Sequence, residues 1–345
     1  MLRKLIVFAM LFLSIALMYA CSKNETELLP TQVDITFTVP ANFPAPTYNF
    51  ENNKLTNAGF ALGRKLFYEA RLSADKSISC GSCHQQFAAF ANLDHKVSHG
   101  VNNCQGKRNS PPLFNLAWQK GYFWDGGVKN IETVPLNAIG DVCEMSTDIQ
   151  SIITFLKNTP PYPNLFKQAF GATEINSQLV LKSFAQFTAV LVSGNAKYDQ
   201  VSRKENGATF TPGEQAGYLL FKEKCSSCHK EPFFTDFSYR SNGLDLTSTD
   251  EGRAHITGVE TDMGTFRVPT LRNIEYTGPY MHDGRFYSLD EVLEHYNSGV
   301  EPAENLDPLL KNGIALSATE QKQIKLFLIT LTDHDFIKNT LYSEQ

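Results

Sequence analysis

The pentapeptide Cys-X-X-Cys-His occurs twice in this chain, and each copy is an attachment site for a large prosthetic group. Residues 80–84 read Cys-Gly-Ser-Cys-His and residues 225–229 read Cys-Ser-Ser-Cys-His. This motif binds c-type haem through its two cysteines, and its histidine is placed to become an axial ligand of the iron. One zinc ion held by four cysteines is the alternative, but the cysteine pairs of zinc sites usually lie about 15–20 residues apart. We therefore expect two covalent haem c groups, held by Cys80, Cys83 and His84 and by Cys225, Cys228 and His229.

The N-terminus has the pattern of a bacterial lipoprotein signal. Two basic residues precede an apolar run over residues 5–16, and Cys21 follows a small-residue cleavage site. We expect residues 1–20 to be a signal peptide, Cys21 to carry lipid and residues 21–45 to be a tether, which places the protein in the periplasm on a bacterial membrane. An uncleaved membrane anchor is the alternative, although the apolar run is shorter than the roughly 20 residues of a span.

Net charge and the remaining cysteines add two further expectations. The formal net charge of −5 leaves no basic patch for nucleic acid, so we expect no nucleic-acid partner. Of the seven cysteines, lipid and haem use five, which leaves Cys104 and Cys143. In an oxidising compartment these two can form a disulfide, and two buried free thiols are the alternative.

Segments around the two haem motifs resemble each other. Gly-Arg-Lys-Leu-Phe at 63–67 precedes the first motif, and Gly-Tyr-Leu-Leu-Phe at 217–221 precedes the second. Further on, Trp-Asp-Gly at 124–126 matches His-Asp-Gly at 282–284, each beginning nine residues after an asparagine. Matching offsets of this kind indicate duplication of one domain.

The expected fold is all-α, with two cytochrome c-type haem domains related by duplication and joined by long loops. Thr211 begins a capping-box sequence, so a helix should run into Cys225. Ser288 begins another capping box. We expect the N-terminal haem domain to span residues 46–205 and the C-terminal haem domain to span residues 206–345.

The order of further motifs resembles the bacterial di-haem cytochrome c peroxidase family, which includes the MauG-type enzymes. The motifs are Arg-Asn-Ser-Pro at 108–111, Phe-Trp-Asp-Gly at 123–126, Glu-Met at 144–145, Arg-Val-Pro-Thr-Leu-Arg-Asn at 267–273 and Pro-Tyr-Met-His-Asp-Gly at 279–284. The resemblance implies that the N-terminal haem is the peroxidatic site, where hydrogen peroxide is reduced to water. It also implies that the C-terminal haem takes in electrons from a small cytochrome c or a cupredoxin. A homodimer is compatible with the sequence, which specifies no oligomeric state.

Two residues are candidate catalytic groups. Splitting an O–O bond at iron needs a nearby base that takes up a proton and returns it. By resemblance, Glu144 occupies the position of the family's catalytic glutamate, and the alternative is a solvated surface carboxylate. Trp124 is found where the family has a tryptophan between its two haems, which can pack there and relay an electron. The alternative for Trp124 is an ordinary core aromatic residue.

The second axial ligand of each haem distinguishes the subfamilies. His95 and His99 follow the first motif, and His99 is nearer the position of the loop histidine that blocks the iron in resting peroxidases. Both histidines can instead be solvated, with the haem open as in MauG-type enzymes. For the second haem, Tyr296 stands where peroxidases that need priming have a methionine and MauG-type enzymes a tyrosine. A phenolate ligand favours ferric iron. Met281 is the alternative ligand, and Tyr296 can also be simple helix packing.

Calcium is the last ligand that the resemblance implies. The family binds one calcium ion between the domains, and Asn109, Thr277 and Pro279 stand at the matching positions, with oxygen donors that suit a hard cation. The expected function is therefore a di-haem cytochrome c peroxidase. The alternatives are a MauG-type oxidase that uses peroxide to oxidise a partner protein or small substrate, and a non-catalytic electron carrier.

Overall fold

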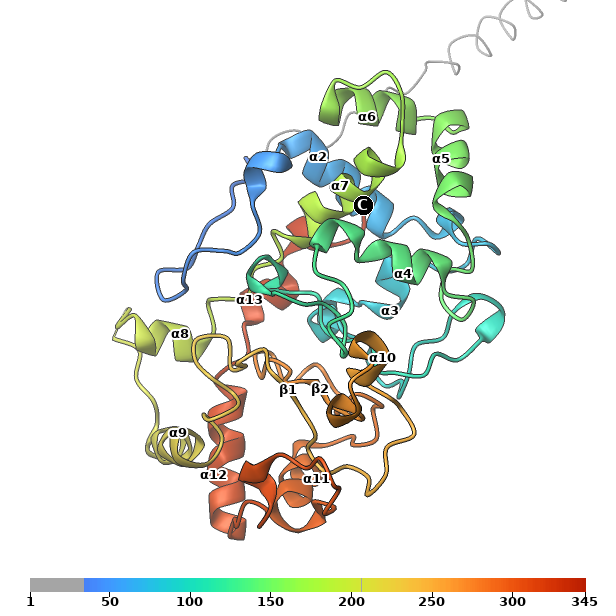
Figure 1. The fold of residues 1–345 in the computed structure, drawn as a ribbon. Helices are drawn as coiled ribbons and strands as arrows, with labels where there is room; N and C mark the ends of the chain where they lie inside the picture. Colours follow the sequence, from blue (N-terminus) through green and yellow to red (C-terminus); the bar gives the residue numbers. More distant parts are fainter. Residues whose placement is uncertain (1–33, 206) are drawn as a thin grey trace, which may run out of the picture.

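The computed structural model describes residues 34–205 and 207–345, which are mostly helical and joined by long loops (Figure 1). The expected signal peptide, Cys21 and the first part of the expected tether lie outside the described residues. Within the described part, no helix is long and apolar enough to cross a membrane. The helical class is confirmed, with one small two-stranded antiparallel sheet as a departure from all-α.

Short helices dominate the fold, and their bounds show how much of the chain is loop. The α-helices are α2 (Asn57–Phe67), α3 (Cys80–Cys83), α4 (Pro135–Gly140), α5 (Ile149–Asn158), α6 (Tyr162–Phe170), α7 (Ser177–Thr188), α8 (Lys197–Ser202), α9 (Pro212–Lys224), α10 (Ala254–Thr257), α11 (Leu289–Glu294), α12 (Ala318–Ile329) and α13 (His334–Lys338). The strands are β1 (Tyr239–Arg240) and β2 (Phe266–Arg267). One π-helical turn, η8 (His295–Gly299), continues α11. Single 3-10 turns are η1 (Phe50–Asn52), η2 (Ala70–Leu72), η3 (Gln86–Ala88), η4 (Val101–Asn103), η5 (Leu116–Trp118), η6 (Ile131–Thr133), η7 (Glu260–Asp262), η9 (Pro308–Leu310) and η10 (Thr340–Tyr342).

Capping boxes begin the helices where the sequence predicts them. The Thr211 hydroxyl accepts a hydrogen bond from the Glu214 N–H at 3.3 Å, and the Glu214 carboxylate accepts one from the Thr211 N–H at 2.6 Å. The same reciprocal pairing occurs at Ser288 and at Ser317. Because these pairs satisfy the first backbone donors, each helix begins at a defined residue. From its N-cap at Thr211, α9 runs to Lys224 and so leads directly into Cys225, as predicted.

A close helix pair lies beside each haem motif. In the first half, α2 packs against α7, and a Cβ atom on Gly63 would collide with the Ser183 carbonyl. In the second half, α9 packs against α12, and a Cβ atom on Gly217 would collide with the Gln323 carbonyl. Both helix crossings are thus close enough that only glycine fits. Figure 1 shows the two pairs at opposite ends of the molecule.

The C-terminal segment returns to the first half of the chain. Phe336 and Ile337 of α13 are buried in an aromatic cluster with Phe67 and Phe90 of the first half. In addition, Arg64 donates a hydrogen bond to the Leu341 carbonyl at 2.7 Å. Residues after α12 therefore stabilise the packing around the first haem motif, although they follow the second motif in sequence.

Part of the expected tether is packed against both halves. Phe43 is buried and contacts Trp118 edge-on, with 5.3 Å between ring centroids, and Phe233 of the second half at 4.7 Å. Phe43 also stacks on the guanidinium of Arg272. Arg272 is fully buried and pairs with both carboxylate oxygens of Asp199 at 2.8 Å. This buried ion pair holds Arg272 of the second half against α8.

Candidate active site

The first haem motif forms a short helix that ends in an oriented histidine. α3 spans the two cysteines, and the Nδ1 atom of His84 lies 2.9 Å from the carbonyl oxygen of Phe90. Burial lowers the pKa of His84 to about 4, so the ring is neutral. A backbone carbonyl on Nδ1 leaves Nε2 of a neutral imidazole as the metal-binding atom.

The second motif repeats this arrangement. The Nδ1 atom of His229 lies 3.0 Å from the carbonyl oxygen of Phe234, and burial lowers the His229 pKa below its usual value. Phe90 and Phe234 both adopt a left-handed backbone conformation, which turns each loop back to its histidine. The two loops therefore orient the two rings in the same way.

These residues fit two covalent haem groups. All four motif cysteines are free thiols, and none is paired in a disulfide. Cys80 packs on the aromatic cluster around Phe90, and Cys225 packs on the cluster around Phe234, so each attachment point borders apolar surface. Each haem would be held by two thioether bonds and one histidine, and it would supply redox chemistry and a site for peroxide.

Glu144 lies beside the first motif. Burial, followed by the nearby Asp141 carboxylate, raises the pKa of Glu144 to about 7. After the larger effect of burial, the Glu144 charge is the next contribution that raises the pKa of the Cys83 thiol, to about 11. The side chain is therefore half-buried and lies near the haem attachment point.

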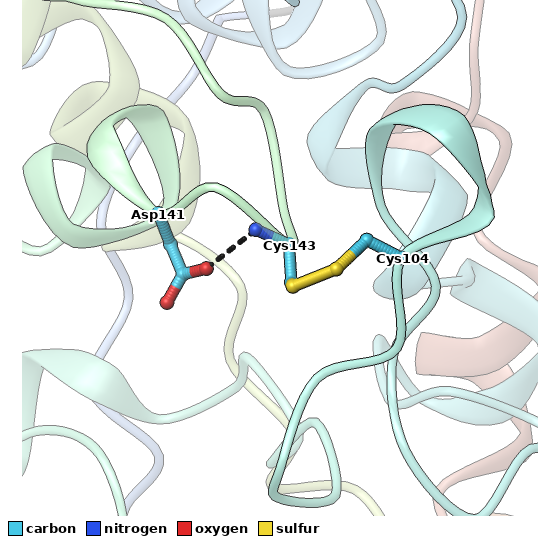
Figure 2. The surroundings of a disulfide bond; sticks show 3 residues. All are labelled: Cys104, Asp141 and Cys143. Carbon is cyan, nitrogen blue, oxygen red and sulfur yellow. Dashed lines mark hydrogen bonds between the residues drawn. A yellow bond between two sulfur atoms is a disulfide. The ribbon is translucent and has the colours of Figure 1, made fainter.

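A disulfide joins the segment of Glu144 to the loop that follows the first motif. Cys104 and Cys143 are bonded, and the Cys143 N–H donates to the Asp141 carboxylate at 2.7 Å (Figure 2). Gly100 packs so tightly against the Cys143 carbonyl that a Cβ atom would collide with it. Of the two alternatives for these cysteines, the structure contains the disulfide.

The loop histidines lie in this tethered segment. The His99 carbonyl accepts a hydrogen bond from the Cys83 thiol at 4.0 Å, so its backbone borders the first motif. Its Nδ1 atom lies 3.1 Å from the Asn103 side-chain oxygen, and its ring meets the His95 ring edge-on at 5.0 Å. Ligation of the first iron by either histidine stays a prediction.

Trp124 is buried at the junction of the two halves. Its indole N–H donates to the Asn109 carbonyl at 2.8 Å, and its own carbonyl accepts from the Arg267 N–H at 2.7 Å. The Asn109 N–H in turn donates to the His282 carbonyl at 2.7 Å. Trp124 therefore connects the first half with two motifs of the second half.

Charged groups reinforce this junction. Arg108 pairs with Asp125 at 2.5 Å and with Asp250 of the second half at 2.7 Å. The ring of His282 stacks on Phe266 with 3.6 Å between centroids. Both acids contact one half-buried guanidinium, so these two ion pairs are stronger than exposed ones. They hold the segment of Trp124 against the second half.

Tyr296 and Met281 both lie close to the side chain of Asn242. Tyr296 belongs to the π-helical turn η8, and the nearby Cys225 and Cys228 thiols contribute to its raised pKa of about 12, after the larger effect of burial. The Asn242 side chain near the Tyr296 hydroxyl acts in the opposite direction and lowers the pKa of Tyr296. The same side chain donates through Nδ2 to the Met281 sulfur at 3.4 Å. Tyr296 therefore lies near the second motif. Met281 lies near the same asparagine as Tyr296.

One of the expected calcium ligands, Asn109, lies at the Trp124 junction. Asn109 is buried, and its amide nitrogen donates to the Lys96 carbonyl at 3.2 Å, which leaves its side-chain oxygen as the atom for a cation. Thr277 is buried, and the peptide bond between Gly278 and Pro279 is cis. Among the described residues, no group of three or more acidic, histidine or cysteine side chains forms a metal cluster. Calcium binding stays a prediction.

Sequence reasoning missed the parts of the site that come from backbone and distant loops. The Phe90 and Phe234 carbonyls orient the haem histidines, but a carbonyl has no sequence signature. Asn242 lies in a loop outside all the recognised motifs, so nothing in the sequence marks it. Phe90 and Phe234 follow their histidines by only six and five residues, so their proximity was the one available signal.

Fold and site together define a c-type cytochrome with two attachment sites, and comparison with known proteins identifies its family. The family model described as di-haem cytochrome c peroxidase matches residues 57–207. The methylamine utilization protein MauG of Methylorubrum extorquens is 34% identical over 301 residues, covering 86% of this chain and 83% of that protein. Cytochrome c551 peroxidase of Nitrosomonas europaea is 34% identical over 245 residues, covering 69% and 72%. The chain belongs to the di-haem cytochrome c peroxidase and MauG family of oxidoreductases.

Solved structures agree with this assignment. The crystal structure of a MauG-like protein associated with microbial copper homeostasis superposes with a TM-score of 0.82 at 28% identity, covering 90% of this chain and 99% of that one. The di-haem peroxidase BthA of Burkholderia thailandensis gives a TM-score of 0.70 at 20% identity, which shows the shared fold alone.

Proposed function

We propose that this protein is a di-haem cytochrome c peroxidase that reduces hydrogen peroxide to water at the haem of His84. The observation that carries the proposal is Glu144, a half-buried carboxyl with a pKa of about 7 beside Cys80 and Cys83. Near neutral pH such a group is present in both protonation states. It can therefore take a proton from one peroxide oxygen and give it to the other, which is worth roughly 10²–10⁴ in rate.

Electrons would enter at the haem of His229 from a small cytochrome c or a cupredoxin. Trp124 supports this division, because its hydrogen bonds join the two halves and its indole offers a path between them. The name of the Nitrosomonas relative, a cytochrome c551 peroxidase, is consistent with such a donor.

A MauG-type oxidase is the second candidate, and Tyr296 is the observation that favours it. The side chain lies near the thiols of Cys225 and Cys228, which agrees with a tyrosine ligand to the second iron. A phenolate stabilises ferric iron, so both haems would react in the oxidised state and the oxidising power would pass to a partner protein or small substrate. A non-catalytic carrier is disfavoured, because electron transfer alone has no use for an acid with a pKa of about 7 beside the first haem motif.

Duplication and domain bounds belong to the same proposal. Gly63 and Gly217 serve equivalent helix crossings, and His84 and His229 have equivalent carbonyl partners. We place the haem domains at residues 46–205 and 206–345, with α13 packed back onto the first. Lipidation at Cys21, a periplasmic location, a calcium ion at Asn109 and a homodimer complete the proposal.

Steady-state turnover of peroxide tests the main proposal and separates it from the oxidase. The holoprotein is assayed with reduced cytochrome c as donor, either fully oxidised at the start or half-reduced beforehand. A peroxidase turns over many equivalents of peroxide, whereas an oxidase consumes peroxide slowly with this donor and reacts while both haems are ferric. Absence of any reaction with peroxide in either state would leave only the electron carrier.

A further inference from the structure

Arg267 has a buried positive charge that no carboxylate of the described residues neutralises. The side chain is 7% exposed, and its Nε atom donates to the Phe123 carbonyl at 3.2 Å. Within residues 34–205 and 207–345, its Nη1 and Nη2 atoms donate to no protein acceptor, and the guanidinium forms no ion pair. Burial lowers the pKa of Arg267 below its usual value. An unpaired charge is costly to take out of water, so this position needs an anion that the described chain does not supply.

Strand β2 directs Arg267 away from the acidic side chains of the junction. Neighbouring residues of a strand point to opposite faces. Phe266 packs on His282, with 3.6 Å between ring centroids, and the guanidinium of Arg108 lies over the Phe266 ring. Arg108 and its two aspartate partners are therefore on the Phe266 side of the strand. Arg267 instead lines a cavity whose walls come from both halves of the chain.

Gln119 lines the same cavity from the first half. It is 8% exposed, and among the described residues its side-chain amide has no hydrogen-bond partner. No fully enclosed side-chain nitrogen or oxygen of those residues lacks a partner, so the free atoms of Arg267 and Gln119 are open to the cavity. A guanidinium and an amide that face one cavity provide the donors for a carboxylate, which arginine binds in bidentate fashion.

The loop that orients His229 forms another part of the cavity wall. Phe233 and Thr235 both line the cavity. They flank Phe234, whose carbonyl oxygen lies 3.0 Å from the His229 Nδ1 atom. Haem has ionised propionate carboxylates at its edge, so the haem held by this loop brings carboxylates to this part of the molecule. The second haem is therefore a source of the anion that Arg267 lacks.

We propose that Arg267 and Gln119 form a carboxylate site that binds a propionate of the second haem. The proposal needs only covalent haem at Cys225 and Cys228, so it holds equally for a peroxidase, an oxidase or an electron carrier. Arg267 also connects this haem to the junction, since its backbone N–H donates to the Trp124 carbonyl at 2.7 Å. A positive charge near the haem disfavours ferric iron, so Arg267 raises the reduction potential of the second haem.

The test compares the purified holoprotein with three variants. Arg267→Met removes the charge, Arg267→Lys keeps the charge without the bidentate geometry, and Gln119→Leu removes the amide. Arg64→Met is the matched control, because Arg64 is also 7% exposed and donates to a carbonyl, that of Leu341, but belongs to α2 in the first half. The measurement is the reduction potential of each haem by spectroelectrochemical titration at fixed pH and ionic strength, with and without acetate as a free carboxylate.

We expect Arg267→Met to shift the second haem about tenfold toward the ferric state, which lowers its potential by about 59 mV for one electron. Arg267→Lys and Gln119→Leu should lower the same potential by less. The Arg64→Met control should leave the second haem unchanged, and acetate should not alter the wild-type potential.

An unchanged potential of the second haem in Arg267→Met, or a decrease at the first haem alone, overturns the proposal. If Arg267→Met does not fold, unchanged potentials in both Arg267→Lys and Gln119→Leu overturn it instead. If the wild-type potential depends on acetate and that of Arg267→Met does not, a free carboxylate occupies the cavity and the propionate assignment is wrong.

Discussion

The backbone N–H of Val101 donates a hydrogen bond of 2.9 Å to the carbonyl oxygen of Glu144. Three residues after Val101, Cys104 is covalently bonded to Cys143, the residue before Glu144. One hydrogen bond and one disulfide thus hold the segment of Glu144 to the loop after the first haem motif. The two cysteines of that disulfide are 39 residues apart in sequence.

Replacing both Cys104 and Cys143 by serine should lower the rate of the peroxide reaction, because the segment of Glu144 is no longer cross-linked. The same variant should lose about 2–4 kcal/mol of stability. If the disulfide acts through Glu144, its loss will cost little further rate in a Glu144→Gln background, since coupled positions are non-additive. Stopped-flow haem spectra with peroxide measure all four proteins, and fully additive effects would reduce the disulfide to a general stabiliser.

Glu144→Gln should keep both haem spectra and lower peroxide turnover by about 10²-fold or more, because the amide cannot accept the proton. With a pKa of about 7, the wild-type rate should rise as pH increases through about 7, and the variant should lack this rise. A turnover and a pH profile equal to those of the wild type would make Glu144 a structural residue.

Stability should respond to the same group. Burial raises the pKa of Glu144 from 4.5 to about 7, so the folded protein holds this proton more tightly than the unfolded chain does. Its contribution to stability is therefore fully present below pH 4.5 and is lost as pH rises through about 7. Urea unfolding at pH 5 and pH 8 should show a larger decrease for the wild type than for Glu144→Gln.

Trp124→Phe should keep both haems but slow electron transfer between them, because it removes the indole that we propose as the electron path between the two halves. Loss of its hydrogen bond to Asn109 should cost about 1 kcal/mol of stability. Trp118→Phe is the matched control, since Trp118 is also buried and donates to a carbonyl, that of Pro44, at 2.7 Å. Equal transfer rates in the two variants, measured after flash reduction, would make Trp124 an ordinary core residue.

Tyr296→Phe should change the ferric spectrum of the second haem, whereas Met281→Leu should leave it nearly as it is. The reason is that Tyr296 lies near Cys225 and Cys228, the attachment cysteines of the second haem. Ferric electronic absorption spectra and paramagnetic resonance spectra of the two variants show which side chain ligates the second haem. The opposite pattern would assign methionine ligation and favour a peroxidase that needs reductive priming.

Gly63→Ala should destabilise the protein by about 1–3 kcal/mol, because the added methyl group would collide with the Ser183 carbonyl across the α2 and α7 crossing. Gly140→Ala is the control. It lies at the end of α4 with no atom within 4 Å of the added Cβ, so it should be neutral or slightly stabilising. Urea midpoints report both changes, and equal midpoints would show that the crossing relaxes at no cost.

Local chemistry made the haem motifs and the helix starts readable from sequence alone. The two pentapeptides carry their own cysteines and histidines, and each capping box satisfies its backbone donors within four residues. Family resemblance added Glu144 and Trp124, whose catalytic roles stay predictions. The bounds of α9 followed from Thr211 and from the motif it precedes.

Only the tertiary structure decided what depends on groups far apart in the chain. The bond between Cys104 and Cys143, the return of α13 to the first half and the contact of Asn242 with Met281 and Tyr296 all need loops to meet in space. Sequence periodicity describes one helix or strand at a time. It contains no information on tertiary contacts between distant loops. The sequence by itself therefore determined the cofactor chemistry and the helical class, whereas long-range packing decided which side chains surround each haem site.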